Sequence, residues 1–155
     1  VKDTQSGEIL LGGVVNNVIS WQSSMRNALS QFVLGYGDAL ITYENEAFHA
    51  VFGQGYDFEI VYPVSTIYGE HKAVIVDKHV DDRERELIEE FIQFLFTIEV
   101  QMFMVNNYFR TMDETLYFGH SEYVDIQLPF YVDYLGGWEV AHEELVEGLF
   151  VQLKK

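Results

Sequence analysis

GDALITYENEA (residues 37–47) and FEIVYP (residues 58–63) are the stretches that decide which fold we expect. Residues 39–42 are almost continuously apolar, which is typical of a strand buried on both faces, and a polar turn and a helix start follow them. Residues 59–62 predict a second short buried strand, which Pro63 ends. This alternation predicts an α/β protein, a class that binds small ligands at turns outside the carboxyl ends of its strands.

The same alternation runs through the rest of the chain. Ser23 and Ser24 are favourable N-cap residues for a helix that ends at Val33. Asp81 or Asp82 caps the clearest helix, which has one apolar stripe and an acidic opposite side. The pattern predicts further helices over 7–15, 44–52 and 98–109, strands over 18–21, 73–77 and 124–128, a turn over 129–135, and a loop over 136–148 that leads into a final amphipathic helix. We therefore expect one α/β domain over residues 1–155.

The composition fits a single folded domain. Of the 155 residues, 48% are hydrophobic and 22% are charged, and no apolar run approaches the roughly 20 residues of a membrane span. The 12 Phe and 10 Tyr indicate a core packed with rings, with an aromatic platform for a sugar as the alternative. Because the net charge is −16, a nucleic acid would be repelled, so we expect no nucleic-acid partner.

No catalytic or metal-binding pattern is present in the sequence. The five histidines are scattered and form no HxxxH or HExxH pair, and there is no cysteine. GxSxG, Walker and GxGxxG motifs are absent, and Ser23 and Ser24 have no evident base partner. We therefore expect no enzyme, no catalytic residue, no metal site and no cofactor.

The turn QSSMRN (residues 22–27), between an expected strand and an expected helix, is a candidate anion site. The first N–H groups of a helix have no partner within the helix and lie at the positive end of its dipole, and the hydroxyls of Ser23 and Ser24 can add donors. Tyr43 follows a predicted buried strand, which would present its phenol at the same edge of the sheet. These groups predict an oxyanion pocket built from neutral donors, with an ordinary capping turn as the alternative.

Three ordered blocks of the chain resemble the second lobe of the sulfate-binding proteins that feed ABC importers. The first is residues 37–63, whose GDALITYENEA and FEIVYP resemble the family's GD-(V/A)-LI-x-(W/Y)-ENEA and FEIV-x-P. The second is residues 73–110, with AVIVDKHVDD and EEFIQFLFTIEVQMFMVNNYFR. The third is residues 126–153, with IQLPFYVDYLGGWEVAHEELVEGLFVQL. The resemblance extends from about residue 17 to the end of the chain.

The resemblance implies one lobe of a type II periplasmic-binding-protein fold, with a mixed, mostly parallel sheet flanked by helices. It also implies that neutral hydrogen-bond donors hold sulfate or a similar oxyanion between two lobes. The family's donor turn falls here on Ser23, Ser24, Met25 and Arg26. Met25 then gives its backbone N–H, with Ser24 as the fallback because the spacing to Tyr43 is one residue shorter, and Arg26 supports the turn from the side. The family's tryptophan falls on Tyr43, which leaves room for a different ligand.

The family's role implies the wider setting. The parent protein would bind sulfate or thiosulfate in the periplasm, or outside the cell on a membrane anchor, and dock on the permease of an ABC transporter. The family's first lobe has no counterpart here, and the chain starts at Val1 without an initiator Met or a signal peptide, so we expect a processed chain or a piece of a longer protein. We expect weak binding, and a homodimer through the surface that the missing lobe leaves exposed.

Two alternatives remain open at this point. The same fold would bind another ligand: molybdate, phosphonate, ferric ion or a small organic anion, which the tyrosine at position 43 favours. An isolated lobe would have only a structural or self-association role, which the missing lobe favours. Dimer formation without stabilisation by any anion would support the second alternative.

Overall fold

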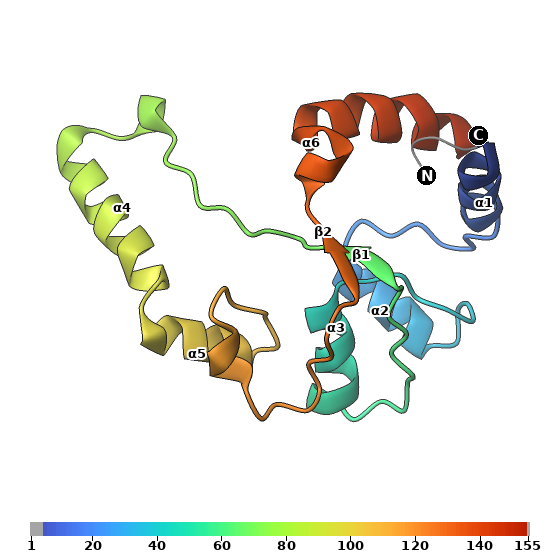
Figure 1. The fold of residues 1–155 in the computed structure, drawn as a ribbon, viewed down its shortest axis with the longest axis horizontal. Helices are drawn as coiled ribbons and strands as arrows, with labels where there is room; N and C mark the ends of the chain where they lie inside the picture. Colours follow the sequence, from blue (N-terminus) through green and yellow to red (C-terminus); the bar gives the residue numbers. More distant parts are fainter. Residues whose placement is uncertain (1–4, 155) are drawn as a thin grey trace. The chain divides into compact units, whose positions relative to one another are not determined.

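The computed structural model describes residues 5–154, and Figure 1 shows it as a ribbon. Its contacts divide the chain into two compact units. The described residues of unit 1 are 5–41, Val61–Glu70 and 126–154, and those of unit 2 are Thr42–Ile60 and His71–Asp125. Both units are therefore assembled from segments that lie far apart in the sequence.

Unit 1 contains helices and a parallel pair of strands. Its helices are α1 (Gln5–Asn16), α2 (Met25–Val33) and a C-terminal helical run made of α6 (Gly137–Val140), a π-helical segment (Ala141–Phe150) and α7 (Val151–Leu153). Strands β1 (Ser65–Ile67) and β2 (Leu128–Phe130) pair in parallel, with Ser65 opposite Leu128 and Ile67 opposite Phe130. A 3-10 turn, Val132–Leu135, connects β2 to the C-terminal run.

Glycine conformation and close packing shape unit 1. Gly136 and Gly137 have φ of 93° and 86°, a left-handed region that glycine enters without the steric cost of a Cβ, and α6 begins there. A Cβ built on Gly12 of α1 would lie 3.5 Å from the side chain of Leu153 in α7, so these two helices pack closely. The buried apolar side chains of the unit come from α1, α2 and the C-terminal segment: Val15, Leu29, Val132 and Ala141.

Unit 2 is helical in its described secondary structure. It contains α3 (Glu44–Phe48), which continues as a π-helical turn (His49–Gly53), then α4 (Asp82–Leu95), α5 (Ile98–Asn106), and 3-10 turns at Asp77–His79 and Glu114–Tyr117. A capping box starts α4: the Asp81 carboxylate accepts the Glu84 N–H at 2.8 Å, and the Glu84 carboxylate accepts the Asp81 N–H at 3.2 Å. Phe48, Ala50 and Val105 are its buried apolar residues.

The helices predicted from capping and periodicity are confirmed. The structure places α1, α2, α3 with its π-helical continuation, α4 and α5 where the sequence indicates them, with ends that differ by a few residues. The loop expected over 136–148 is wrong, because the C-terminal helical run already begins at Gly137. Two adjacent glycines resemble a loop signal, yet here their positive φ starts a helix.

Most of the predicted strands are wrong. Residues 18–21, 39–42, 59–62 and 73–77 form no strand, and in place of the strand over 124–128 and the turn over 129–135 the structure has β2 and a 3-10 turn. A short apolar run indicates burial, but it does not show which distant run supplies its hydrogen-bonding partner. Residues 5–154 combine helices with one parallel strand pair, without a larger sheet, and the type II lobe stays a prediction.

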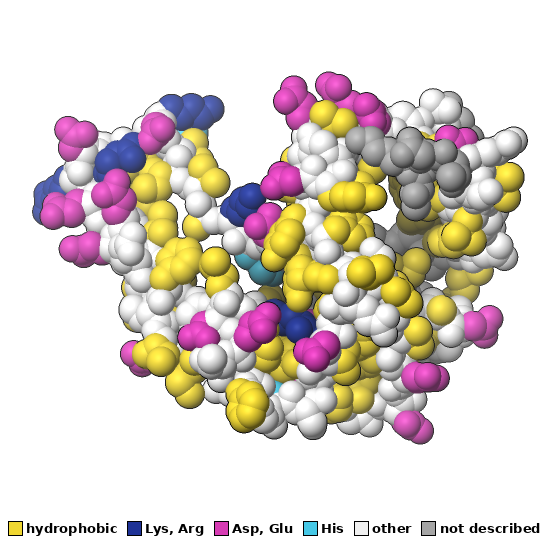
Figure 2. Space-filling view, viewed as in Figure 1, with side chains coloured by type: hydrophobic (Ala, Val, Ile, Leu, Met, Phe, Trp, Pro, Cys, Tyr) yellow, Lys and Arg dark blue, Asp and Glu magenta, His cyan; other side chains and the backbone are white. Residues whose placement is uncertain are grey.

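Apolar side chains reach the surface of the chain. Figure 2 shows yellow hydrophobic side chains beside magenta acidic ones on the visible face. On the apolar stripe of α4, Leu87, Phe91 and Phe94 are 69%, 58% and 50% exposed. Among the helices of residues 5–154, none combines the length and the apolar character that crossing a lipid bilayer requires.

Candidate functional site

The predicted anion turn lies in unit 1, at the start of α2. Ser24 is the N-cap: its backbone is extended (φ −146°, ψ 153°), and its Oγ accepts the backbone N–H of Asn27 at 3.2 Å. The capping role expected from the sequence is therefore confirmed. Because this bond uses only a lone pair of the hydroxyl oxygen, the O–H of Ser24 can still donate to a ligand.

The surface of this turn suits a negative ligand. Ser23, Ser24 and Arg26 are exposed, and Met25 is half-buried. The first turn of α2 carries no acidic side chain, so no carboxylate on that turn competes with an anion for the helix N-terminus. A helix N-terminus with flanking hydroxyls can bind an anion without a countercharge.

Tyr43 lies in unit 2, as the N-cap of α3. Its backbone is extended (φ −77°, ψ 151°), its side chain makes no capping hydrogen bond, and its carbonyl accepts the N–H of Ala47 at 3.1 Å. Tyr43 is 63% exposed. The phenol is thus accessible to a ligand, and its backbone forms the N-cap of α3.

Glu44, the first residue of α3, is held by Arg110 in a two-pronged ion pair. The Nε of Arg110 donates to Glu44 Oε2 at 2.7 Å, and its Nη2 donates to Oε1 at 2.9 Å. The same Nη2 also donates to the carbonyl of Val124 at 2.7 Å. The Arg110 and Glu44 side chains are 15% and 22% exposed, so water screens this pair much less than a surface ion pair.

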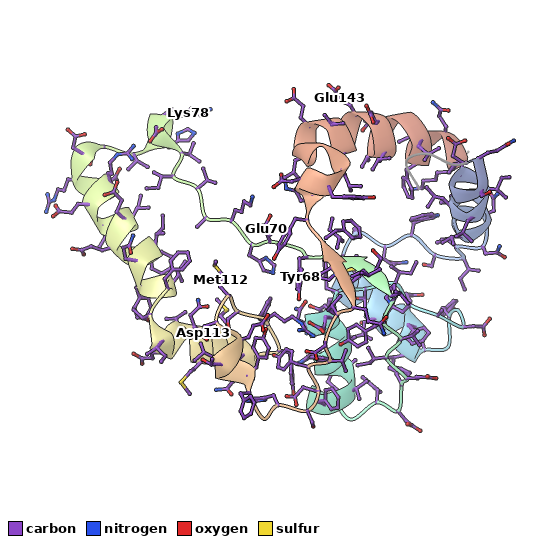
Figure 3. All side chains as sticks on the ribbon, viewed as in Figure 1. Tyr68, Glu70, Lys78, Met112, Asp113 and Glu143 are labelled. Atoms are coloured by element: carbon purple, nitrogen blue, oxygen red, sulfur yellow. The ribbon has the colours of Figure 1, made fainter. Side chains whose placement is uncertain are left out.

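Two tyrosine rings support the guanidinium of Arg110. Its central carbon lies 5.3 Å from the ring centroid of Tyr123 and 5.9 Å from that of Tyr117. Tyr117 belongs to the 3-10 turn that Asp113, labelled in Figure 3, caps: its carboxylate accepts the hydroxyl of Thr115 at 2.6 Å and the N–H of Thr115 at 3.0 Å. These bonds, the hydroxyl's first, hold the pKa of Asp113 below its usual value, so the cap stays charged.

Tyr123 is a neutral donor at the centre of this cluster. Its hydroxyl donates to the carbonyl of Val105 at 3.1 Å and lies 3.4 Å from the carbonyl of Phe109. Burial raises the pKa of Tyr123 to about 12, and the carboxylates of Glu44 and Glu122 act in the same direction. The phenol therefore stays protonated at neutral pH.

A second polar pair lies next to Tyr123. The Nδ1 of His120 is 2.9 Å from Oε1 of Glu122. Burial acts to raise the pKa of Glu122, but hydrogen bonds from its own backbone N–H and from His120 outweigh burial, and the pKa lies below its usual value. Glu122 is therefore a carboxylate at neutral pH.

The structure brings part of the predicted site together. Ser23, Ser24, Met25 and Arg26 are consecutive on one turn of unit 1, whereas Tyr43 belongs to unit 2. A pocket that combines them stays a prediction. Sequence reasoning missed the Glu44–Arg110 pair, although both residues lie in the blocks that carry the family resemblance, ENEA and NNYFR. Within the part of the chain that the structure describes, no three His, Cys, Asp or Glu side chains gather as metal ligands would.

Curated proteins that match this chain are named as sulfate-binding and thiosulfate-binding proteins. The chain is 31% identical to the sulfate-binding protein of Escherichia coli strain K12, over 99% of this chain and 48% of that protein. It is 32% identical to the thiosulfate-binding protein of Pseudomonas aeruginosa, over 70% of this chain and 33% of that protein. It is 30% identical to the sulfate-binding protein of Synechocystis, over 75% of this chain and 34% of that protein.

These matches confirm the resemblance predicted from the three sequence blocks. The chain spans about half the length of the curated relatives it matches, as expected for a partial counterpart of them. The relatives are named as binding proteins and not as enzymes, in agreement with the expectation that the chain is not an enzyme. No protein-family profile matches the chain, and no solved structure gives a significant match.

Proposed function

We propose that this chain is the part of an extracytoplasmic solute-binding protein that binds sulfate or thiosulfate for an ABC importer. The observation that carries the proposal is the similarity to named sulfate-binding proteins along 99% of the chain. The parent protein would act in the periplasm, or outside the cell on a membrane anchor, and would deliver the anion to a permease.

The distribution of charge supports an anion at the start of α2. The chain has 25 Asp and Glu, yet residues 9–37, which contain the whole turn and α2, have none, and Arg26 is their single charged side chain. In a protein of net charge −16, no carboxylate of this stretch adds to the repulsion of an anion at the helix N-terminus. The positive end of the helix dipole and Arg26 would favour an anion there.

The protein groups that we propose to bind the anion are neutral hydrogen-bond donors. At the start of α2 in unit 1, the backbone N–H of Met25 and the hydroxyls of Ser23 and Ser24 would donate to the anion, and Arg26 would support the turn from the side. In unit 2, the phenol of Tyr43 is a further proposed donor. Donors of this kind favour sulfate, which carries no proton at neutral pH. A phosphate that keeps one proton would place a donor against a donor and bind less well.

The tyrosine at position 43 favours a second candidate function, in which the same fold binds a different ligand. A phenol reaches a different distance and in a different direction from an indole, so the site would suit molybdate, phosphonate, ferric ion or a small organic anion. The exposed stripe of α4 supports the remaining candidate, a lobe that self-associates as a homodimer and binds no ligand.

Isothermal titration with sulfate, thiosulfate and phosphate in a low-chloride buffer tests the proposal. We expect saturable heat with sulfate or thiosulfate, a Kd on the order of 1 mM and about −4 kcal/mol, and no saturable heat with phosphate. Molybdate and phosphonate titrations separate the second candidate, and the sedimentation coefficient with and without sulfate separates the third. No saturable heat from either sulfur oxyanion up to tens of millimolar would contradict the proposal.

A further inference from the structure

We infer that Arg110 is a positioning residue for the oxyanion site: it fixes the backbone of Tyr43 by clamping the adjacent Glu44. The inference rests on the proposed function, because it assigns a role to Tyr43 in binding. The geometry that carries it lies entirely within unit 2.

The clamp joins segments that are 66 residues apart in sequence. Both prongs of the guanidinium reach the Glu44 carboxylate, at 2.7 and 2.9 Å, and a third N–H reaches the Val124 carbonyl at 2.7 Å. A two-pronged pair fixes orientation as well as distance, and the low exposure of both side chains keeps it from exchanging with water. Arg110 therefore fixes where α3 starts.

The start of α3 needs such support from outside. The helical segment consists of α3 (Glu44–Phe48) and the π-helical turn His49–Gly53, which together are shorter than the roughly 12 residues that an isolated helix needs for stability, and the N-cap Tyr43 contributes no side-chain hydrogen bond. Phe48, the last residue of the α-helical part, is 1% exposed and packs edge-on against Tyr123 at 5.3 Å between ring centroids. Tyr123 also lies under the guanidinium of Arg110, so one ring contacts both the clamp and the buried side of α3.

The clamp acts on Tyr43 and not on the anion directly. The positive charge of Arg110 is matched by Glu44, and the guanidinium lies over the rings of Tyr123 and Tyr117. Tyr43, in contrast, is 63% exposed, so a ligand can reach it. A fixed backbone with an exposed donor lowers the entropy that binding must overcome.

A double-mutant cycle with sulfate separates this role from a general loss of structure. In the chain with Tyr43, Arg110→Gln is expected to raise the sulfate Kd about fivefold, the amount that loss of one hydrogen bond gives. In a Tyr43→Phe background the same substitution should raise the Kd by less than about twofold, because the donor it positions is already gone. An equal factor in both backgrounds, or no effect in either, would overturn the inference.

Amide hydrogen exchange without sulfate provides a readout that does not depend on binding. The N–H of Ala47 donates to the Tyr43 carbonyl at 3.1 Å, and that of Ala28 donates to the Ser24 carbonyl at 3.0 Å in unit 1. Arg110→Gln should speed exchange at Ala47 and leave Ala28 unchanged. If the unmodified chain binds no sulfate, the proposed function fails, while exchange at Ala47 still decides the clamp: faster supports it, and unchanged overturns it.

Two further variants guard against misfolding and charge effects. Glu44→Gln keeps the shape of the side chain and one acceptor oxygen. It should speed amide exchange at Ala47 and lower the free energy of unfolding less than Arg110→Gln does. Arg85→Gln removes the same charge from α4, where Arg85 pairs with Asp77 and, at 3.7 Å, with Glu89. Arg85→Gln should change neither the sulfate Kd nor amide exchange at Ala47. If it changed both as much as Arg110→Gln does, the loss of a positive charge would explain the effects and the clamp would be overturned.

Discussion

The indole ring of Trp21 packs edge-on against the ring of Phe150, with 5.4 Å between ring centroids and 83° between ring planes. The ammonium group of Lys154 lies 4.5 Å from the centroid of the same indole. Trp21 directly precedes the turn at residues 22–27, and Phe150 ends the π-helical segment of the C-terminal run. The C-terminal helix therefore anchors the segment that leads into the proposed anion turn.

Removing the ring of Phe150 should release Trp21. Phe150→Ala in a Trp138→Phe background, which leaves Trp21 as the single tryptophan, is expected to shift the fluorescence maximum to longer wavelength and to increase quenching by acrylamide. The free energy of unfolding should fall by about 1 kcal/mol, the amount that such aromatic pairs contribute. Phe91→Ala on the exposed stripe of α4 is the control, and an equal spectral shift there would contradict the contact.

The N-cap of α2 separates helix stability from anion binding. Ser24→Ala loses the bond to Asn27 and should cost about 1 kcal/mol of unfolding free energy, measured by urea titration. Ser24→Asp keeps an acceptor for the cap and should retain that stability, but its negative charge should abolish sulfate binding.

Ser23→Ala is the matched control for the cap. Ser24, not Ser23, accepts the N–H of Asn27, so the unfolding free energy of Ser23→Ala should change by less than about 0.5 kcal/mol. Sulfate binding by Ser24→Asp as tight as that of the unmodified chain would rule out an anion at this turn.

The raised pKa of Tyr123 predicts a loss of stability at high pH. Unfolded, the phenol loses its proton near pH 10, whereas folded it keeps the proton up to about 12. Between these values the unfolded chain binds fewer protons than the folded chain, so the free energy of unfolding should fall as the pH rises from about 10 to about 12. Urea unfolding at several pH values measures this slope.

Tyr123→Phe isolates the effect, because lysines and the other tyrosines also titrate in that range. The variant should be about 1 kcal/mol less stable at pH 7, since it loses the bond to the Val105 carbonyl. Its stability should then decline less steeply than that of the unmodified chain above pH 10. Two parallel curves would show that Tyr123 does not carry the effect.

Phe48 is the buried centre of unit 2. Its ring lies 5.4 Å from Phe52, 6.1 Å from Tyr108 and 5.3 Å from Tyr123 between centroids, and 1% of the residue is exposed. Phe48→Ala should cost about 3–5 kcal/mol, because it leaves a cavity that these rings cannot fill, and thermal unfolding measures the loss. Phe118→Ala, at a residue 92% exposed, should cost less than about 0.5 kcal/mol.

Local interactions that can be recognised in the sequence were sufficient to predict the helix starts and the donor turn of the candidate site. Ser24 caps α2 and Asp81 caps α4, because a cap needs only a side-chain oxygen and an N–H within three residues. The predicted helix starts at these positions are therefore confirmed. The donor turn at residues 23–26 follows from the same local rule together with the family resemblance.

The strands and the pairing partners were beyond local reasoning. The apolar run 39–42 has the composition of a buried strand, yet β1 and β2 lie elsewhere, at Ser65–Ile67 and Leu128–Phe130. A strand exists only when another segment supplies hydrogen bonds, and that segment can be dozens of residues away. Composition alone does not identify it.

The helix starts, the acid-free stretch around α2 and the resemblance to sulfate-binding proteins follow from the order of residues, because each depends on neighbours in the chain or on the order of motifs. The folded chain alone reveals that Arg110 holds Glu44 beside Tyr43, and that Phe150 packs on Trp21 beside the proposed anion turn. These contacts join residues far apart in sequence, and their geometry depends on how the whole of each unit packs.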